Sequence, residues 1–464
     1  MQVTYGSIHY QEDQLFLEAT KLWNLKSLYT DLAKQKQKNT KKETKLTPIE
    51  KACLRGLLSG CSPRTIATAL NWTSASISVE LTKGLYRYVE LLTGRQQNVV
   101  KNWRDISQWL ETAGYKTSIP RQDWGESPDI SVFYGRIEEL TVLEQWIVRD
   151  NCRLVTLLGM GGIGKTALAG QLAKEIQGKF DFVFWRSLHY APSINQLLVD
   201  LIQFLDNQQQ CDLSEKTEVL ISRLRKCLRQ KRCLVVLDDA ENIMRCRTHA
   251  GHYRDGYERY AQLMRQVALE RHQSCLLLIS REKPLQIELL EYKTPRVRSL
   301  KLRGLPKEEG RKIFESKGFL REQKEWDELI TIYRGHCLAL HLVAPIIQDF
   351  FDGSVSQFLS WNNMIIPVIV PEPLRGILFD QFNRLDNSEK KIMCYLATNL
   401  TPVSLKKLRN GVRIDSASEL INVLKSLERR SMIEVEKNIQ GSQTNFKLQP
   451  IIRLAFREHY NIES

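Results

Sequence analysis

The feature that most constrains this chain is one octapeptide, in which four glycines precede a lysine and a threonine. Its residues are Gly159, Met160, Gly161, Gly162, Ile163, Gly164, Lys165 and Thr166. They fit the pattern G-x-x-x-x-G-K-[ST], directly after the apolar run 154–158 and directly before a helix-forming run that starts at Ala167. Glycine lets the backbone turn its N–H groups toward an anion, and the following helix adds the positive end of its dipole. The pattern therefore predicts a phosphate-binding loop between a strand and a helix of a parallel α/β sheet.

Two side chains of this loop indicate which phosphate compound it binds. Lys165 offers a mobile positive charge for the β- and γ-phosphates of a nucleotide, and the Thr166 hydroxyl offers a ligand for magnesium. The backbone of residues 159–167 would hold the remaining phosphate oxygens. We therefore expect ATP or ADP, with Mg²⁺, as the cofactors.

Two further apolar runs end in residues that suit the same site. Residues 234–237 end in Asp238 and Asp239, of which Asp238 can hold Mg²⁺ through water and Asp239 can orient or deprotonate an attacking water. Residues 275–279 are followed by Ser280 and Arg281, whose guanidinium could sense or neutralise the charge of a γ-phosphate. We therefore predict Asp239 and Arg281 as the catalytic side chains.

The apolar pattern and the polar interruptions predict six segments. Short β-branched runs alternate with helical stretches up to about residue 303, helical periodicity follows, and the last part combines helices with two short strands. The segments are a basic N-terminal segment and linker (1–45), a helix-turn-helix module (46–94), a linker (95–131), an α/β nucleotide-binding domain (132–303), a helical domain (304–370) and a winged-helix domain (371–464).

The N-terminal boundaries depend on charge and on helix caps. Residues 33–45 carry many lysines and almost nothing apolar, which predicts a solvated linker. Thr47 with Glu50, and Ser62, are typical N-caps of helices, and a tight turn before residue 74 suggests helix-turn-helix. The third helix begins without lysine or arginine before Lys83, so we expect a protein partner for this module more than DNA.

Composition adds limits on the class of protein. The chain has 464 residues, 42% of them hydrophobic and 26% charged, and no apolar run approaches the roughly 18 to 20 residues that span a bilayer. The N-terminus lacks the pattern of a secretory signal, and ten cysteines contain no CxxC pair, so we expect a cytoplasmic protein. The net charge of +14 permits a polyanionic partner without selecting one.

These motifs, in this order, resemble the NB-ARC family of STAND nucleotide switches. Phe133, Tyr134, Gly135 and Arg136 are similar to the family motif whose hydrophobic residues line the adenine site. The double aspartate and the strand that ends at Arg281 resemble the family's metal-binding strand and sensor arginine. The resemblance covers residues 132–460 and implies an ADP- or ATP-controlled switch. Most relatives continue into C-terminal repeats, whereas we expect none here because the sequence stops at Ser464.

Two positions of the resemblance depart from the family pattern. The run that contains Cys337 and Leu338 is similar to a helix start where the family has proline against adenine, and Cys337 replaces that proline. Gln449 stands where the family often has a histidine that contacts the ADP phosphate. The resemblance implies nucleotide contact by Cys337, Leu338 and Gln449.

Three functions fit these observations. The first is a signalling switch with slow ATP hydrolysis, which exposes an N-terminal adaptor module or drives self-association in the ATP state. The alternatives are a nucleotide-controlled transcription regulator and a DNA-stimulated ATPase of the initiator or loader class. Cys246, His249 and His252 lack a fourth ligand, so we expect a mobile loop there instead of a metal site.

Overall fold

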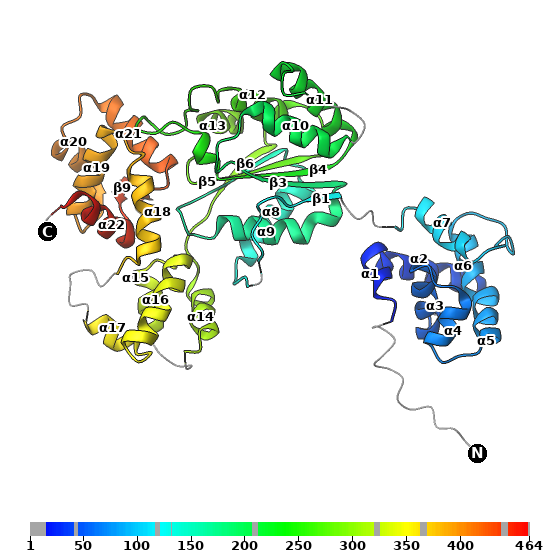
Figure 1. The fold of residues 1–464 in the computed structure, drawn as a ribbon. Helices are drawn as coiled ribbons and strands as arrows, with labels where there is room; N and C mark the ends of the chain where they lie inside the picture. Colours follow the sequence, from blue (N-terminus) through cyan, green and yellow to red (C-terminus); the bar gives the residue numbers. More distant parts are fainter. Residues whose placement is uncertain are drawn as a thin grey trace. The chain divides into compact units, whose positions relative to one another are not determined.

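The computed structural model describes residues 15–40, 45–116, 121–130, 132–206, 212–319, 325–361, 369–437 and 444–462. The chain divides into two units, Met1–Ile119 and Pro120–Ser464 (Figure 1). Among the described residues, the first unit has one cluster of buried hydrophobic residues and the second unit has two. Within the described residues, no helix is long and apolar enough to cross a membrane.

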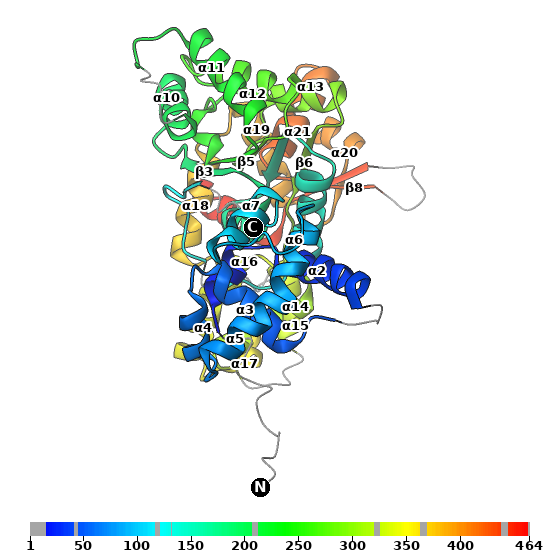
Figure 2. The ribbon, with the colours of Figure 1, turned by 90° about the vertical axis from the view of Figure 1, so that its right-hand side faces the viewer.

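The regular elements in the described part of the first unit are helices, apart from one isolated bridge (Figure 2). Thr47 accepts a hydrogen bond from the Glu50 amide in a complete capping box, and Ser62 caps the next helix, so both predicted caps are confirmed. The elements are α1 (Leu17–Leu22), α2 (Leu25–Thr40), α3 (Pro48–Leu58), α4 (Pro63–Ala69), α5 (Ser74–Glu80), the π-helix η2 (Leu81–Leu85), α6 (Tyr86–Leu92) and α7 (Arg104–Thr112).

The linker predicted at residues 33–45 is wrong in its first part, which is the second half of α2. Leu28 and Leu32, one turn apart and just before the charged stretch, are completely buried in the core of the first unit. Lys36 continues the same face, and its Nζ donates to Glu50 Oε2 over 2.7 Å. The apolar face that anchors the helix therefore lies upstream of the charges that suggested a linker.

The linker predicted at residues 95–131 is wrong in part, because some of its described residues belong to the folded units on either side. Ile106 and Leu110 of α7 are buried in the core of the first unit, and Lys116 pairs with Trp23 in an isolated antiparallel bridge. Farther along, residues 121–123 form a strand of the second unit. This stretch therefore contains the end of the first unit and the beginning of the second.

The second unit begins with the predicted parallel α/β sheet, which is confirmed. The six strands are parallel in the order β1-β3-β4-β5-β2-β6. In Figure 1, α8 and α9 cover one face, and α10 to α13 cover the other. The strands are β1 (Arg121–Asp123), β2 (Leu154–Leu158), β3 (Phe182–Ser187), β4 (Cys233–Asp238), β5 (Cys275–Ser280) and β6 (Val297–Lys301). The helices are α8 (Ile137–Glu144), η3 (Gln145–Arg149), α9 (Lys165–Ile176), η4 (Gln177–Lys179), α10 (Ile194–Leu205), α11 (Thr217–Gln230), η5 (Ala240–Ile243), α12 (Arg259–Leu269) and α13 (Leu285–Lys293).

Helices follow the sheet, and then helices combined with a small antiparallel sheet. The helices that follow are α14 (Lys307–Ser316), α15 (Glu325–Ile332), α16 (Cys337–Phe350) and α17 (Val355–Trp361). The last segment contains α18 (Glu372–Phe382), α19 (Asn387–Thr398), β7 (Val403–Ser404), α20 (Leu405–Gly411), α21 (Ala417–Arg429), β8 (Glu434–Lys437), β9 (Thr444–Lys447) and α22 (Pro450–Tyr460). Strand β9 pairs with β7 and β8, and α22, which the sequence analysis did not predict, contacts α18 and α19.

Candidate functional site

The phosphate-binding loop connects the buried strand β2 to helix α9. Gly162 and Gly164 have φ values of 75° and 101°, which only glycine adopts without strain, and α9 begins directly after Gly164. The loop borders a cavity of about 350 Å³ at the carboxyl edge of the sheet. This is the edge at which open parallel sheets bind ligands.

Lys165 lies over the loop that precedes it. Its Nζ donates to the carbonyl oxygens of Gly159 over 3.0 Å and Met160 over 2.9 Å. Burial lowers the pKa of Lys165 to about 8, while the carboxylate of Glu241 opposes that shift. The ammonium is thus held at the phosphate loop by two carbonyl groups that phosphate oxygens can replace.

The carboxylates that follow β4 stand opposite the loop. Burial and the charge of Asp239 raise the pKa of Asp238 to about 7, against hydrogen bonds from Thr166 and from the Asp239 amide. Asp239 has a φ of 55°, and its Oδ2 accepts from the Ser187 hydroxyl of β3 over 3.0 Å. The Asp238 carboxylate beside the Thr166 hydroxyl can bind a hydrated Mg²⁺. The hydrogen bond from Ser187 of β3 fixes the direction of the Asp239 carboxylate.

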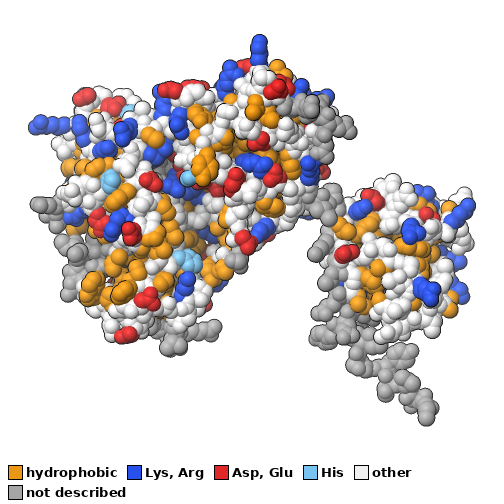
Figure 3. All heavy atoms as spheres, in the orientation of Figure 1, with side chains coloured by type: hydrophobic (Ala, Val, Ile, Leu, Met, Phe, Trp, Pro, Cys, Tyr) orange, Lys and Arg blue, Asp and Glu red, His pale blue; other side chains and the backbone are white. Residues whose placement is uncertain are grey.

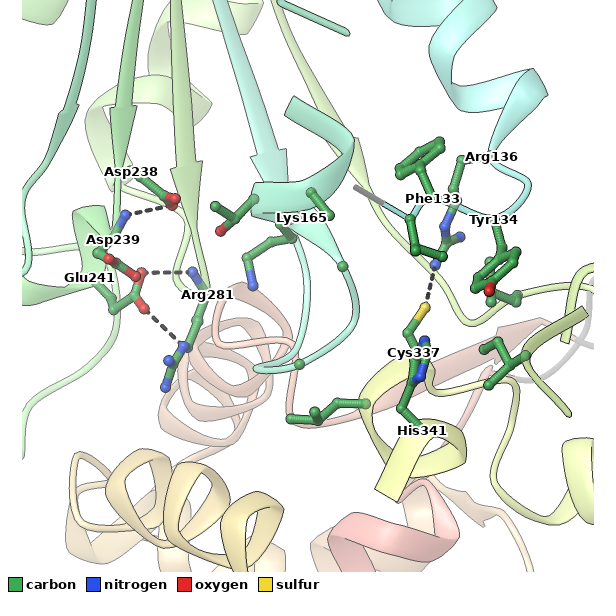
Figure 4. A pocket seen from close by; sticks show the side chains of 18 residues that line it. Phe133, Tyr134, Arg136, Lys165, Asp238, Asp239, Glu241, Arg281, Cys337 and His341 are labelled. Atoms are coloured by element: carbon green, nitrogen blue, oxygen red, sulfur yellow. Dashed lines mark hydrogen bonds and ion pairs between the residues drawn. The ribbon is translucent and has the colours of Figure 1, made fainter. Parts of the chain in front are cut away.

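Glu241 of η5 belongs to this site, although the sequence analysis did not select it. Its Oε1 lies 2.9 Å from Nε of Arg281, and its Oε2 accepts from the Arg281 amide over 3.0 Å (Figure 4). The sequence signal for Glu241 was its place two residues beyond Asp239, just after a strand that ends in carboxylates. The pairing therefore had to come from the tertiary structure.

The other end of the cavity is apolar and aromatic. Phe133 and Tyr134 lie there, and the rings of Tyr134 and His341 have centroids 6.2 Å apart with planes tilted by 34° (Figure 4). Leu305, Ile313 and Leu338 complete this wall. An aromatic slot beside a phosphate loop is suited to a purine base.

Arg136 and the start of α16 tie this apolar end to the loop. Arg136 donates from Nη2 to the carbonyl oxygen of Ile163 over 3.1 Å and is held by Glu139 over 2.8 Å. The Cys337 thiol donates to the same carbonyl over 3.3 Å, and the Leu338 amide donates to Gly162 O over 3.1 Å. The helix start that contains Cys337 is therefore hydrogen-bonded to the phosphate loop itself.

The cavity brings most of the predicted site residues together. Those that line it are Phe133, Tyr134, Arg136, Gly162, Gly164, Lys165, Thr166, Ala167, Asp238, Asp239, Arg281, Cys337 and Leu338. Its lining does not include Gly135, Gly159, Met160, Gly161, Ile163 or Gln449. Lining residues that the sequence analysis missed are Val132, Glu241, Leu305, Ile313 and His341.

Gln449 is the N-cap residue of α22 and does not line this cavity. Its carbonyl accepts from the Arg453 amide over 2.9 Å. Contact between Gln449 and a nucleotide stays a prediction.

The loop that contains Cys246, His249 and His252 is not the free loop that we expected. Cys246 Sγ accepts from Arg384 over 3.2 Å, and His249 Nε2 lies 3.4 Å from Asp386 Oδ2. Both partners lie in the turn between α18 and α19, so the loop is held against the last segment. Across the parts of the chain that the structure describes, no group of three or more His, Cys, Asp or Glu could hold a metal ion.

Comparisons with known proteins agree with this geometry. Residues 137–253 match the NB-ARC domain family. The chain is 44% identical over 373 residues to an uncharacterized WD repeat-containing protein of Nostoc sp. (strain PCC 7120 / SAG 25.82 / UTEX 2576), a match that covers 76% of this chain and 29% of that protein. It is 29% identical over 122 residues to the disease resistance-like protein DSC1 of Arabidopsis thaliana, covering 25% of this chain and 10% of that protein. The chain thus spans less than a third of the length of either relative.

The solved Walker-type ATPase paby2304 of Pyrococcus abyssi has a similar fold. The TM-score is 0.50 at 15% identity, and the match covers 73% of this chain and 98% of the other. This likeness concerns the fold alone. Together, the two matches show a segment similar to the NB-ARC domain family within a parallel-sheet P-loop NTPase fold.

Proposed function

We propose that this chain is a molecular switch in which bound ADP holds three parts of the second unit closed around the phosphate loop. Exchange of ADP for ATP opens them. The observation that carries the proposal is that residues of the α/β domain, of α16 and of α18 all contact the phosphate loop. A ligand shifts such a balance only through its different affinity for the two states.

The contacts to the loop come from residues far away in the sequence. His336, which is completely buried, approaches the carbonyl oxygen of Gly161 to 2.9 Å with Nε2. Its Nδ1 accepts from the Ala339 amide and so caps α16. A Cβ atom at Gly161 would overlap Ile377 of α18. Glycine at position 161 is therefore what allows α18 to approach the loop.

The residues around the cavity have distinct tasks in this proposal. The loop backbone and Lys165 bind the phosphates, and the aromatic end with Tyr134 receives the adenine. Thr166 and Asp238 would hold Mg²⁺, which supplies positive charge to the phosphates when it is bound. Asp239 would direct the attacking water, and Arg281 would neutralise charge on the terminal phosphate.

Slow hydrolysis at Asp239 would reset the switch to its closed state. We expect Asp239→Asn to remain in the ATP-bound form. Opening would free the N-terminal module for a protein partner or for assembly with further copies of this chain. On the face shown in Figure 3, basic and acidic side chains of residues 120–464 are interspersed, which offers no extended basic surface to DNA there.

The test is the identity of the nucleotide that copurifies with the protein. The protein is denatured and the released nucleotide is identified by chromatography, with Lys165→Ala as the binding-deficient variant. Lys174→Ala, an exposed lysine of the same helix α9, is the matched control.

About one ADP per chain in the wild type and in Lys174→Ala, and none in Lys165→Ala, is the result expected for a closed switch. A site that is empty on purification and hydrolyses ATP only after DNA is added would instead favour the DNA-handling ATPase. A wild-type protein that binds neither nucleotide would reject both.

A further inference from the structure

Arg281 is anchored by one carboxylate in a position where it touches the phosphate loop. Glu241 binds its Nε over 2.9 Å and its amide over 3.0 Å, and the Glu241 side chain is only 7% exposed. A Cβ atom added at Gly161 of the loop would lie 3.5 Å from Arg281 Cζ. The guanidinium thus lies close both to Glu241 and to the loop that receives phosphates.

A second cavity, of about 230 Å³, lies behind this ion pair. Asp239, Glu241 and Arg281 line both cavities, so they form the wall between them. The other lining residues include Glu282, Arg384 and Arg430, of which the arginines belong to the last segment.

Arg384 connects that last segment to Glu241 directly. Its Nη2 donates to the backbone carbonyl of Glu241 over 2.9 Å and lies 3.2 Å from Glu282 Oε2. Glu241 therefore holds Arg281 with its carboxylate and the last segment with its carbonyl group. A shift of Glu241 would disturb both contacts.

We infer that Glu241 is a positioning residue that makes the site prefer a nucleoside diphosphate to a triphosphate. The inference rests on the proposed nucleotide switch and names how that site selects its state. A third phosphate brings further negative charge close to the carboxylates of Asp239 and Glu241 in this wall and of Asp238, which lines the first cavity. The one cation in that wall, Arg281, is neutralised by Glu241 in this structure.

The preference follows from what each ligand requires. A diphosphate can bind to the loop and Lys165 while the Glu241–Arg281 pair stays intact. A γ-phosphate gains full use of Arg281 only when the guanidinium leaves a buried carboxylate, which then loses its partner. Arg384 is hydrogen-bonded to the Glu241 carbonyl, so this rearrangement would also weaken the contact of the last segment. Triphosphate binding would thereby be linked to opening of the second unit.

The experiment compares the dissociation constants of ADP and of a non-hydrolysable ATP analogue in wild type and in Glu241→Gln. Glutamine keeps the size and removes the charge, so the ratio of the ATP-analogue constant to the ADP constant should fall by at least about fivefold, the lower end of common coupling between sites. Glu258→Gln changes an exposed acid of the same domain and should leave the ratio at its wild-type value.

A double-mutant cycle separates positioning of Arg281 from a general structural effect. In an Arg281→Gln background, Glu241→Gln should no longer lower the ratio. If Glu241→Gln fails to fold, Glu241→Asp, which keeps the charge but is too short to bind both the side chain and the amide of Arg281, should lower the ratio by a smaller factor.

Three results can be distinguished. An unchanged ratio in Glu241→Gln, or a fall of the same size with Arg281 absent, would overturn the inference while the switch still stands. A wild-type protein that binds neither nucleotide would overturn the proposed function itself. A fall that depends on Arg281 supports both.

Discussion

Replacing Arg430 by methionine should release the last segment from the nucleotide-binding domain. Arg430 is 3% exposed and lies between two buried carboxylates from different parts of the unit. Its Nη1 is 2.7 Å from Glu282 Oε2, its Nε is 3.0 Å from Glu389 Oε1, and its Nη2 donates to Thr248 O over 2.7 Å. One side chain therefore joins the residue after Arg281 to the start of α19.

The magnitude follows from Glu389, which would lose the arginine that it pairs with, and from Glu282, which would keep only Arg384 at 3.2 Å as its ion-pair partner among the described residues. Glu282 and Glu389 are 2% and 0% exposed, and removal of one member of a buried ion pair costs about 3–5 kcal/mol. Opening of the last segment should then become between about a hundredfold and a few thousandfold more frequent. Methionine is chosen because it keeps most of the apolar volume of the arginine stem.

Hydrogen exchange of the amides in α19 and α21, read by mass spectrometry, measures this opening free energy directly. The matched control is Arg429→Met, the adjacent residue, whose Nε lies 2.7 Å from Glu288 Oε2 but whose side chain is 16% exposed, with that of Glu288 at 26%. A more exposed pair of this kind should cost about 1 kcal/mol or less.

The defect in Arg430→Met should also depend on pH. Burial already raises the pKa of Glu389 with Arg430 present, and loss of the arginine would raise it further. A carboxyl with a raised folded-state pKa costs stability as the pH rises through that pKa, so protection should partly return at lower pH. Equal loss of protection in Arg429→Met and Arg430→Met, or a loss below about tenfold, would refute the reasoning.

Two further perturbations probe single elements. Thr47→Ala removes the cap of α3 and should cost the first unit about 1 kcal/mol, seen as a lower denaturation midpoint, whereas no change would mean that the capping box contributes nothing. Burial lowers the pKa of His336 to about 4, so stability present above about pH 6.5 should be lost as the pH falls toward 4, by up to about 3 kcal/mol. His336→Asn should flatten the pH dependence of hydrogen exchange in α16, and an unchanged profile would exclude His336 as its source.

The sequence by itself determined the phosphate loop and the strand ends that face it. Gly159 to Thr166, Asp238, Asp239 and Arg281 were recognisable because each follows a short apolar run, and the carboxyl ends of parallel strands meet at one edge of a sheet. The caps at Thr47 and Ser62 were recognisable because a cap and its helix are within four residues of each other. These are local signals, because the geometry of a cap or a loop depends on residues that are adjacent in the sequence.

Only the tertiary structure decided which side chains act together. Glu241 and Arg281 are 40 residues apart, and Arg430 and Glu282 are 148 apart, so no spacing rule relates them. Helix α2 also depends on distant residues. Its charged half is helical because Leu28 and Leu32, just upstream, pack in a core formed with later helices. Burial of a charge, and the partner that makes burial tolerable, depend on where distant segments pack, and that is settled only when the whole unit folds.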